Sequence, residues 1–261
     1  MEEIPVDAEG IPASVEETHV DMNKILVHGK IIDITTPISP FTRIFPGDPI
    51  PVIERIFTLE KESCTVSRLS FGSHTGTHVD APSHVLKNGL TIDKLELKNL
   101  MGTATVLYFS SFSGALTANI LEKAFGDIMA PENVSILLLK TGAFSRKQKS
   151  EGKVSSPGSE SESQGMESGK EELSSAYLDE SGAAWIVEKG FKTVGIDSFS
   201  VDNLNSETLP AHHILLLGNV NIVECLELSS VEAGIYFFMC FPLKIDNCDG
   251  SPARALLISY S

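Results

Sequence analysis

Three histidines and an aspartate lie within the twelve residues SHTGTHVDAPSH, at positions 73–84. The whole chain holds seven histidines, so a large share of them falls in this one segment. Imidazole nitrogens and carboxylate oxygens together form a ligand set that suits divalent transition metals such as zinc or manganese. Without such an ion the group would make a poor hydrophobic core. The segment therefore predicts a metal site.

The spacing of these residues requires a bent backbone. His74, His78 and Asp80 fall on alternate positions and would face one side of an extended strand. A straight strand would, however, place His74 about 13 Å from His78, at roughly 3.3 Å per residue. A helix would bring them closer, but Pro82 would break it. We therefore expect a partly extended segment that curls at Gly76 and is stiffened at its exit by the proline.

Two histidines and one carboxylate leave positions open on a metal, which is typical of catalytic rather than structural sites. By spacing alone, His84 is either a further ligand or a proton-transfer residue beside the metal. A second group lies far along the chain, where His212 and His213 precede a Gly-Asn turn and Glu224 follows it. Spacing leaves two readings of this second group open: it joins the first, or it is a helix-cap histidine with a rim glutamate.

The elements that must position these groups indicate a mixed α/β class. Short apolar runs at 102–110 and 134–142 predict buried strands, and the segment between them predicts a helix at 117–126. A second helix is expected at 179–190, closed by Gly190. A strand pair should lead directly into the histidine cluster. Including this pair, further strands are expected at 30–39, 52–61, 64–73, 193–199, 220–226, 235–245 and 252–260.

The chain is long enough for a single large domain, with 261 residues of which 42% are hydrophobic. We expect this domain to span 29–261. Residues 1–28 are acidic and poor in large apolar side chains, which indicates a flexible leader. Residues at about 145–174 are dominated by Ser, Glu, Gly and Lys, which indicates a disordered polar insertion.

The charge and the cysteines limit the partners and the compartment. A formal net charge of -15 argues against nucleic acid or an anionic membrane as a partner. No apolar run is long enough to cross a bilayer, and the N-terminus lacks the features of a secretory signal. The four cysteines, Cys64, Cys225, Cys240 and Cys248, are widely spaced. We expect free buried thiols in a cytoplasmic protein.

Residues 74–84 also match, at every fixed position, the pattern H-x-G-T-H-x-D-x-P-x-H. In this the chain resembles the metal-dependent cyclase-like hydrolases, which include the bacterial-type kynurenine formamidases, or arylformamidases. The similarity covers roughly 30–144 and 176–258. It includes the stretches DITTPIS, FPGDP, GIDSFSVD and PLKIDNCDGSPARALL and the segment 212–224. The resemblance implies a mixed sheet curled into a barrel-like core with flanking helices, a swivelling β/β/α-like cyclase fold. It also implies a homodimer or a higher homo-oligomer such as a tetramer.

The resemblance further implies one or two divalent ions per chain, with zinc expected first and manganese as the alternative. The matching positions assign His74, His78 and Asp80 to the first ion. They assign His212 to the second ion, with Asp80 and Glu224 shared between the two.

The same resemblance gives His84 the role of acid/base residue and places Phe45 against the ring of the substrate. Two departures from the family pattern touch the expected pocket wall. Cys225 stands where the family has Asn after the glutamate, and Ala143-Phe144 stands where a Trp is common.

The activity implied by the resemblance is hydrolysis of N-formylkynurenine, an aryl formamide, to kynurenine and formate through a metal-bound hydroxide. Bound metal lowers the pKa of water from 15.7 to about 7, which supplies hydroxide at neutral pH. Two alternatives stay open. One keeps the site but changes the substrate to a cyclic amide such as isatin, or to a lactone. The other is a non-catalytic metal-binding protein that docks partners through the acidic leader and the polar insertion.

Overall fold

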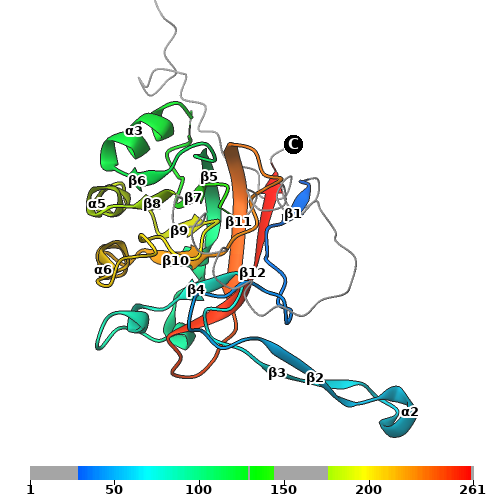
Figure 1. Cartoon of the computed structure of the whole chain (residues 1–261). Helices are drawn as coiled ribbons and strands as arrows, with labels where there is room; N and C mark the ends of the chain where they lie inside the picture. Colours follow the sequence, from blue (N-terminus) through cyan, green and yellow to red (C-terminus); the bar gives the residue numbers. More distant parts are fainter. Residues whose placement is uncertain (1–28, 129, 144–175, 260–261) are drawn as a thin grey trace, which may run out of the picture.

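Eight strands form the central sheet of the structure, a computed structural model that describes residues 29–128, 130–143 and 176–259 (Figure 1). They are β1 (Ile31–Asp33), β4 (His78–Asp80), β5 (Met101–Tyr108), β7 (Ile136–Lys140), β9 (Thr193–Ile196), β10 (Asn221–Glu224), β11 (Gly234–Pro242) and β12 (Gly250–Ser259). The order is β1-β12-β11-β5-β7-β9-β10-β4, and a further pairing joins β4 to β12. This pairing closes all strands except β1 into a ring, which confirms the expected barrel-like core.

The sheet is mixed in direction, as the sequence predicts. β5, β7, β9 and β10 run parallel to one another. The remaining neighbours, including both partners of β4, are antiparallel. Parallel strands are usually covered on both faces and therefore read as continuous apolar runs. β7 follows this rule, because each of its five residues is buried.

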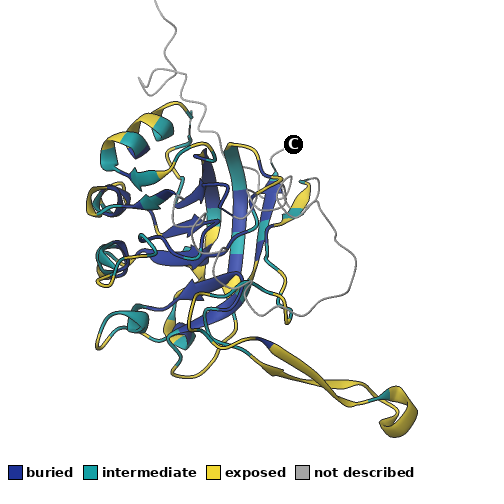
Figure 2. Cartoon of the chain, viewed as in Figure 1, coloured by how far each residue is buried: buried dark blue, intermediate teal, exposed yellow. Residues whose placement is uncertain are grey.

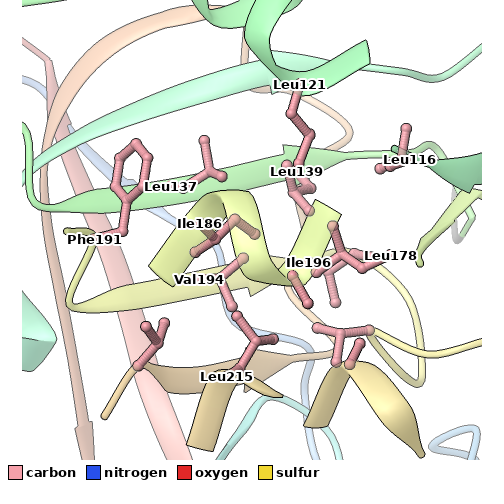
Figure 3. Packing of buried hydrophobic residues seen from close by; sticks show 14 of the residues in the cluster. Leu116, Leu121, Leu137, Leu139, Leu178, Ile186, Phe191, Val194, Ile196 and Leu215 are labelled. Atoms are coloured by element: carbon pink, nitrogen blue, oxygen red, sulfur yellow. The ribbon is translucent and has the colours of Figure 1, made fainter. Parts of the chain in front are cut away.

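Two cores lie on the two faces of the parallel strands. Leu137 and Leu139 of β7 face the helices, where Ile186 and Leu215 pack against them (Figure 3). Leu138, between them, belongs to the core inside the barrel together with Phe238 of β11. Alternate residues of one strand thus serve opposite layers, as the two-residue period of a strand requires.

Three helices cover the outer face of the parallel strands: α3 (Ala118–Gly126), α5 (Glu180–Glu188) and α6 (Pro210–Leu217) (Figure 1). Thr117 accepts a hydrogen bond from the backbone of α3, and Asp179 does the same for α5, so both helices begin at a capping side chain. Gly190 follows α5 with φ +82°. Both predicted helices are therefore confirmed. The sequence identifies 210–217 only as an apolar segment, and the structure forms a helix there.

A two-stranded arm projects from the body of the molecule (Figure 2). It consists of β2 (Val52–Phe57), the short helix α2 (Leu59–Glu62) and β3 (Val66–Ser70). The expected strand pair before the histidine cluster is confirmed, although a helical turn ends the first strand at Phe57. Every residue of both strands is exposed. The arm therefore contributes no side chain to either core.

Shorter elements complete the chain. β6 (Gly114–Leu116) pairs in parallel with β8 (Ala176–Leu178) outside the main sheet. Three short 3-10 helices connect β4 to β5: η1 (Pro82–His84), η2 (Ile92–Lys94) and η3 (Leu97–Leu100). Several strands are shorter than expected, β1 and β9 among them. β1 covers only the first part of 30–39, and β9 ends at Ile196 because the following residues turn away to bind neighbouring loops.

Three expectations on the organisation of the chain have different outcomes. The acidic leader 1–28 and the polar insertion 145–174 both lie outside the described residues. All four cysteines are free, but only Cys225 and Cys240 are buried. Cys64 lies exposed in the arm, so the expectation of burial was wrong there, because every residue of the two arm strands is exposed. Within the described residues, no helix has the length and apolarity needed to cross a membrane.

Candidate metal centre

β4, the strand that closes the barrel, carries the centre of the site. His78 and Asp80 are its two end residues and are both buried. Being two positions apart, they face the same side of the strand. On the adjacent strand β10, Glu224 lies directly opposite His78 in the register. The pairing of β4 with β10 therefore brings a second carboxylate to the motif.

His74 reaches the same place through a turn. Gly76 has φ +65°, a left-handed conformation that glycine adopts without the steric cost of a side chain. A Cβ there would also lie 3.3 Å from the carbonyl oxygen of Thr36. The turn brings the ring centroids of His74 and His78 to 4.9 Å. The expected bend at Gly76 is confirmed.

His84 approaches from the other end of β4. Pro82 opens the 3-10 helix η1, where its fixed φ suits a first helical position. His84 ends this turn, and its ring centroid lies 4.2 Å from that of His74 and 5.7 Å from that of His212. Its side chain is 28% exposed, so it lies nearer the opening of the site than His78 does.

His212 comes from the first turn of α6. Asp202 holds this turn by accepting hydrogen bonds from the backbone nitrogens of Ala211 at 2.8 Å and His212 at 3.0 Å. The same carboxylate lies 2.7 Å from the Nδ1 of His212. The other ring nitrogen, Nε2, lies 3.2 Å from Asp80 Oδ2 and 3.4 Å from Glu224 Oε1. His212 and Glu224 therefore lie with the first group, and Glu224 is buried and not a rim residue.

One nitrogen each of His74, His78 and His212 is held from outside, so the other faces Asp80, and those of His78 and His212 also face Glu224. His78 places Nδ1 2.8 Å from the carbonyl oxygen of Gly76 and Nε2 3.3 Å from Asp80 Oδ1. His74 places Nε2 2.9 Å from Asp249 Oδ2 and Nδ1 2.8 Å from Asp80 Oδ1. Such outer partners fix the tautomer and orientation of metal-binding histidines.

The carboxylates keep their charge in spite of burial. Burial alone would raise the pKa of Asp80, but hydrogen bonds with His212, His74 and His78 hold that pKa well below its ordinary value. Burial and the charge of Asp80 both raise the pKa of Glu224, yet the neighbouring His212 and His78 bring it below its ordinary value. The site is thus built around two buried anions.

The residues fit a divalent cation. The buried Nε2 of His78 has no hydrogen-bond partner within the described part of the chain, although carboxylate oxygens surround it. Two ionised carboxylates at this burial need a compensating positive charge, which either protonated His78 and His212, whose pKa values these carboxylates raise, or a bound cation would supply. Ligand atoms of His74, His78 and Asp80 lie within 4.8 Å of one another, and so do those of Asp80, His212 and Glu224. Because Asp80 belongs to both groups, the geometry accommodates one ion or two.

A cavity of about 200 Å³ opens beside these ligands. Four of the histidines named above line it, together with Glu224. Its other walls are Phe45, Asp48, Phe199, Ser200, Leu209 and Cys225.

Phe45 therefore borders the site, as the resemblance implies. Cys225 also lines it, so this departure from the family pattern does touch the pocket wall. Cys225 has φ +57°, a conformation that Asn tolerates more readily than most residues. His213 is only half-buried and does not line the cavity. Ala143 is buried, whereas Phe144 lies outside the described residues.

Two acidic residues that contact histidines of the site were missed by the sequence analysis. Asp202 supports His212, and Asp249 binds His74. Both lie in stretches that carry the resemblance, GIDSFSVD and PLKIDNCDGSPARALL. An acid within a stretch of this kind was the available signal. This signal could not predict which histidine each acid would contact, because that depends on how the barrel closes.

The comparisons with known proteins agree with this architecture. A family model described as "Putative cyclase" matches residues 32–203. The kynurenine formamidase of Geobacillus thermodenitrificans (strain NG80-2) is 31% identical over 227 residues, which are 87% of this chain and 96% of the relative. A solved structure described as a potential metal-dependent hydrolase with cyclase activity is 25% identical, with a TM-score of 0.65, and the match covers 89% of this chain and 98% of that chain.

An isatin hydrolase bound to the product analogue thioisatinate has a TM-score of 0.73 at 20% identity, over 92% of this chain and 96% of that one. At that identity the likeness shows the fold alone. The closed barrel and its buried histidine–carboxylate group define a metal-dependent hydrolase. The chain belongs to the cyclase family, the metal-dependent cyclase-like hydrolases.

Proposed function

We propose that this enzyme hydrolyses the formyl C–N bond of an aryl formamide, N-formylkynurenine, and releases kynurenine and formate. The reaction class is hydrolysis of carbon–nitrogen bonds other than peptide bonds. The observation that carries the proposal is the convergence of His212 and Glu224 on the histidine motif beside an open cavity. The identity to a kynurenine formamidase, along nearly its whole length, supports the choice of substrate.

The cofactor of the proposal is a divalent metal, zinc first and manganese as the alternative. His74, His78 and Asp80 would hold one ion, and His212 would hold a second that shares Asp80 and Glu224. When bound, a divalent metal lowers the pKa of water to about 7 and polarises a carbonyl oxygen. The histidines suit this role because their outer partners leave one ring nitrogen of each facing the carboxylates.

His84 is the proposed acid/base residue. Its ring lies against that of His74 but stands outside both groups that contain Asp80. Burial lowers the pKa of His84, so the ring is neutral at pH 7 and can accept a proton. It would take the proton of the attacking water and return it to the departing amine. Transfer of this kind contributes about 10² to 10⁴ in rate.

Phe45 is the proposed contact for the aromatic ring of the substrate. It is 39% exposed and lines the cavity together with Phe199 and Leu209. Such walls suit a flat apolar group, since aromatic rings bury large areas and pack against one another edge-to-face or offset. The reacting formyl group would then lie toward the histidines.

Hydrolysis of a panel of substrates by the purified protein tests the proposal. The panel holds N-formylkynurenine, a simpler aryl formamide, isatin and an aromatic lactone, with metal content measured on the same samples. We expect the highest kcat/KM for N-formylkynurenine, loss of activity on chelation, and recovery on return of zinc or manganese. A preference for isatin or for the lactone would instead support the alternative substrates. Failure of the metal-loaded protein on every member would support the non-catalytic alternative.

We further propose a homo-oligomer, a dimer or tetramer, joined through the arm, and a cytoplasmic location. The arm supports the first point, because its strand residues are all exposed among the described part of the chain and an isolated two-stranded hairpin is marginal in water. Its exposed large apolar residues include Val52, Ile53, Phe57, Val66 and Leu69. A second copy of the chain is the proposed cover for this surface. The four free cysteines are in keeping with a reducing compartment.

A further inference from the structure

A carboxylate that no proposed step uses lies against the metal centre. Asp249 immediately precedes β12, and its Oδ2 lies 2.9 Å from the Nε2 of His74. The same oxygen lies 3.7 Å from the Nδ1 of His84. The side chain of Asp249 is 46% exposed, so it stands at the rim of the site and not among the buried ligands.

We propose that Asp249 is a positioning residue, which holds the His74 ring with Nδ1 turned toward the metal. This inference rests on the proposed metal site and not on the identity of the substrate. A carboxylate at Nε2 favours the tautomer that carries its proton there, which leaves the lone pair of Nδ1 free for a ligand bond. Nδ1 is the nitrogen that lies 2.8 Å from Asp80 Oδ1.

The backbone of Asp249 is fixed to the strand that carries Asp80. Its carbonyl oxygen accepts a hydrogen bond from the nitrogen of Ala81 at 2.9 Å. The next residue, Gly250, pairs with Asp80 in the register of β12 and β4. Asp80 and Asp249 contact the two nitrogens of His74. Their relative position is therefore set by the pairing of β4 with β12.

Gly250 allows the ring to come this close. A Cβ at Gly250 would lie 2.8 Å from Cε1 and 3.1 Å from Nε2 of His74. At 2.8 Å either the ring or the strand would have to move. The His74 ring is thus held by Asp80 and Asp249 at its nitrogens and by the bare backbone of Gly250 at its edge.

Asp249 also links His74 to the proposed acid/base residue. The rings of His74 and His84 are 4.2 Å apart, and Oδ2 of Asp249 faces a nitrogen of each. The same three residues would satisfy a different arrangement, in which Asp249 is itself a ligand, because their ligand atoms lie within 4.8 Å of one another. Positioning is favoured because Nδ1 of His74 already faces Asp80. The two arrangements differ in the number of ions bound.

The test is metal binding by Asp249→Asn, measured without any substrate. Zinc affinity is obtained by competition with a chromophoric chelator, and stoichiometry by elemental analysis at saturating zinc. We expect unchanged stoichiometry with affinity lowered about 10- to 100-fold, the usual effect of losing an outer partner of a metal ligand. Asp249→Glu keeps the charge and should recover part of the loss. Asp246→Asn is the matched control, with the same charge change three residues away at an exposed position, and should bind as the wild type does.

Three results would overturn the inference. Affinity within twofold of the wild type would show that Asp249 does not position His74. Loss of one equivalent of zinc at saturation would make it a ligand. An equal loss in Asp246→Asn would show a general charge effect. Absence of zinc binding by the wild-type protein would instead overturn the proposed metal site itself, which separates the two failures. Gly250→Ala, which displaces the ring or the strand and keeps Asp249, should weaken binding in the same direction.

Discussion

The histidines of the site are distinguished by what lies behind each ring. His78 is backed by a carbonyl oxygen, His212 by Asp202 and His74 by Asp249, whereas His84 faces the rim acid only at 3.7 Å. Outer partners of this kind orient metal-binding histidines, so the lack of a close one at His84 within the described chain favours the proton-transfer role over ligation. The residue types alone could not make this distinction, because all four are histidines within reach of acids.

His84→Ala should therefore separate catalysis from metal binding. We expect metal content and unfolding midpoint close to those of the wild type, with kcat/KM for the preferred substrate lowered about 10²- to 10⁴-fold. Elemental analysis and steady-state kinetics on one preparation measure both quantities. Loss of metal together with activity would make His84 a ligand.

The pH profile gives a second check on His84. Burial lowers the pKa of His84 from its ordinary value of 6.5, and a nearby cation would lower it further. A base with a lowered pKa stays deprotonated to lower pH. The ascending limb of kcat/KM against pH should therefore have its midpoint below 6.5, and the residual activity of His84→Ala should lack it. An ascending limb that persists unchanged in His84→Ala would contradict this assignment.

At the scale of elements, the sequence predicted the helices and strands that have a local sequence pattern. The helix at 117–126 has its capping Thr117, and the strand at 134–142 is a short apolar run of the type that parallel sheets bury on both faces. Helix α6 lacked such a signal, because four of its eight residues are buried and its apolar run shows no clear polar face. No local sequence pattern predicts that β9 ends at Ile196, because this end depends on hydrogen bonds to a loop distant in the sequence.

Packing of α5 gives a prediction at this scale. Alanine normally stabilises a helix relative to glycine by up to about 1 kcal/mol. At Gly182, however, a Cβ would lie 2.1 Å from the backbone oxygen of Leu116, which has no flexible end to move aside. Gly182→Ala should therefore destabilise the protein by about 1–3 kcal/mol in chemical denaturation.

Gly126→Ala is the matched control, because a Cβ at that position of α3 meets nothing within 4 Å. It should leave stability unchanged or raise it. An equal loss in both variants would mean that the close approach of α5 to β6 is not what requires glycine at 182.

At the scale of the whole molecule, the site depends on closure of the barrel. Asp80 and His212 are 132 positions apart, and their meeting needs α6, β10 and β4 to be in place together. Spacing along the chain carries no information about such a contact. The resemblance to a family assigned these residues to one site, and the strand order gives the physical reason.

The arm gives the prediction for the assembled molecule. Ile53 and Leu69 face each other across β2 and β3 and are 43% and 58% exposed. The double substitution Ile53→Lys with Leu69→Lys should shift the protein toward smaller species in light scattering, because it places two charges on the proposed contact. Leu97→Lys, at a leucine that is 52% exposed outside the arm, should keep the wild-type size. A monomeric wild type, or equal masses for all three proteins, would contradict the proposed contact.

The strand that closes the barrel has only three residues, and two of them are expected ligands. A cation bound there would cross-link β4 to β10 through Glu224 and to α6 through His212. Metal binding and the stability of the pairing between β4 and its neighbours would then be thermodynamically coupled. Loss of the metal would then lower the stability of the protein as well as its activity. It would open the barrel at β4, and scarcity of the ion would set the lifetime of the protein as well as its rate.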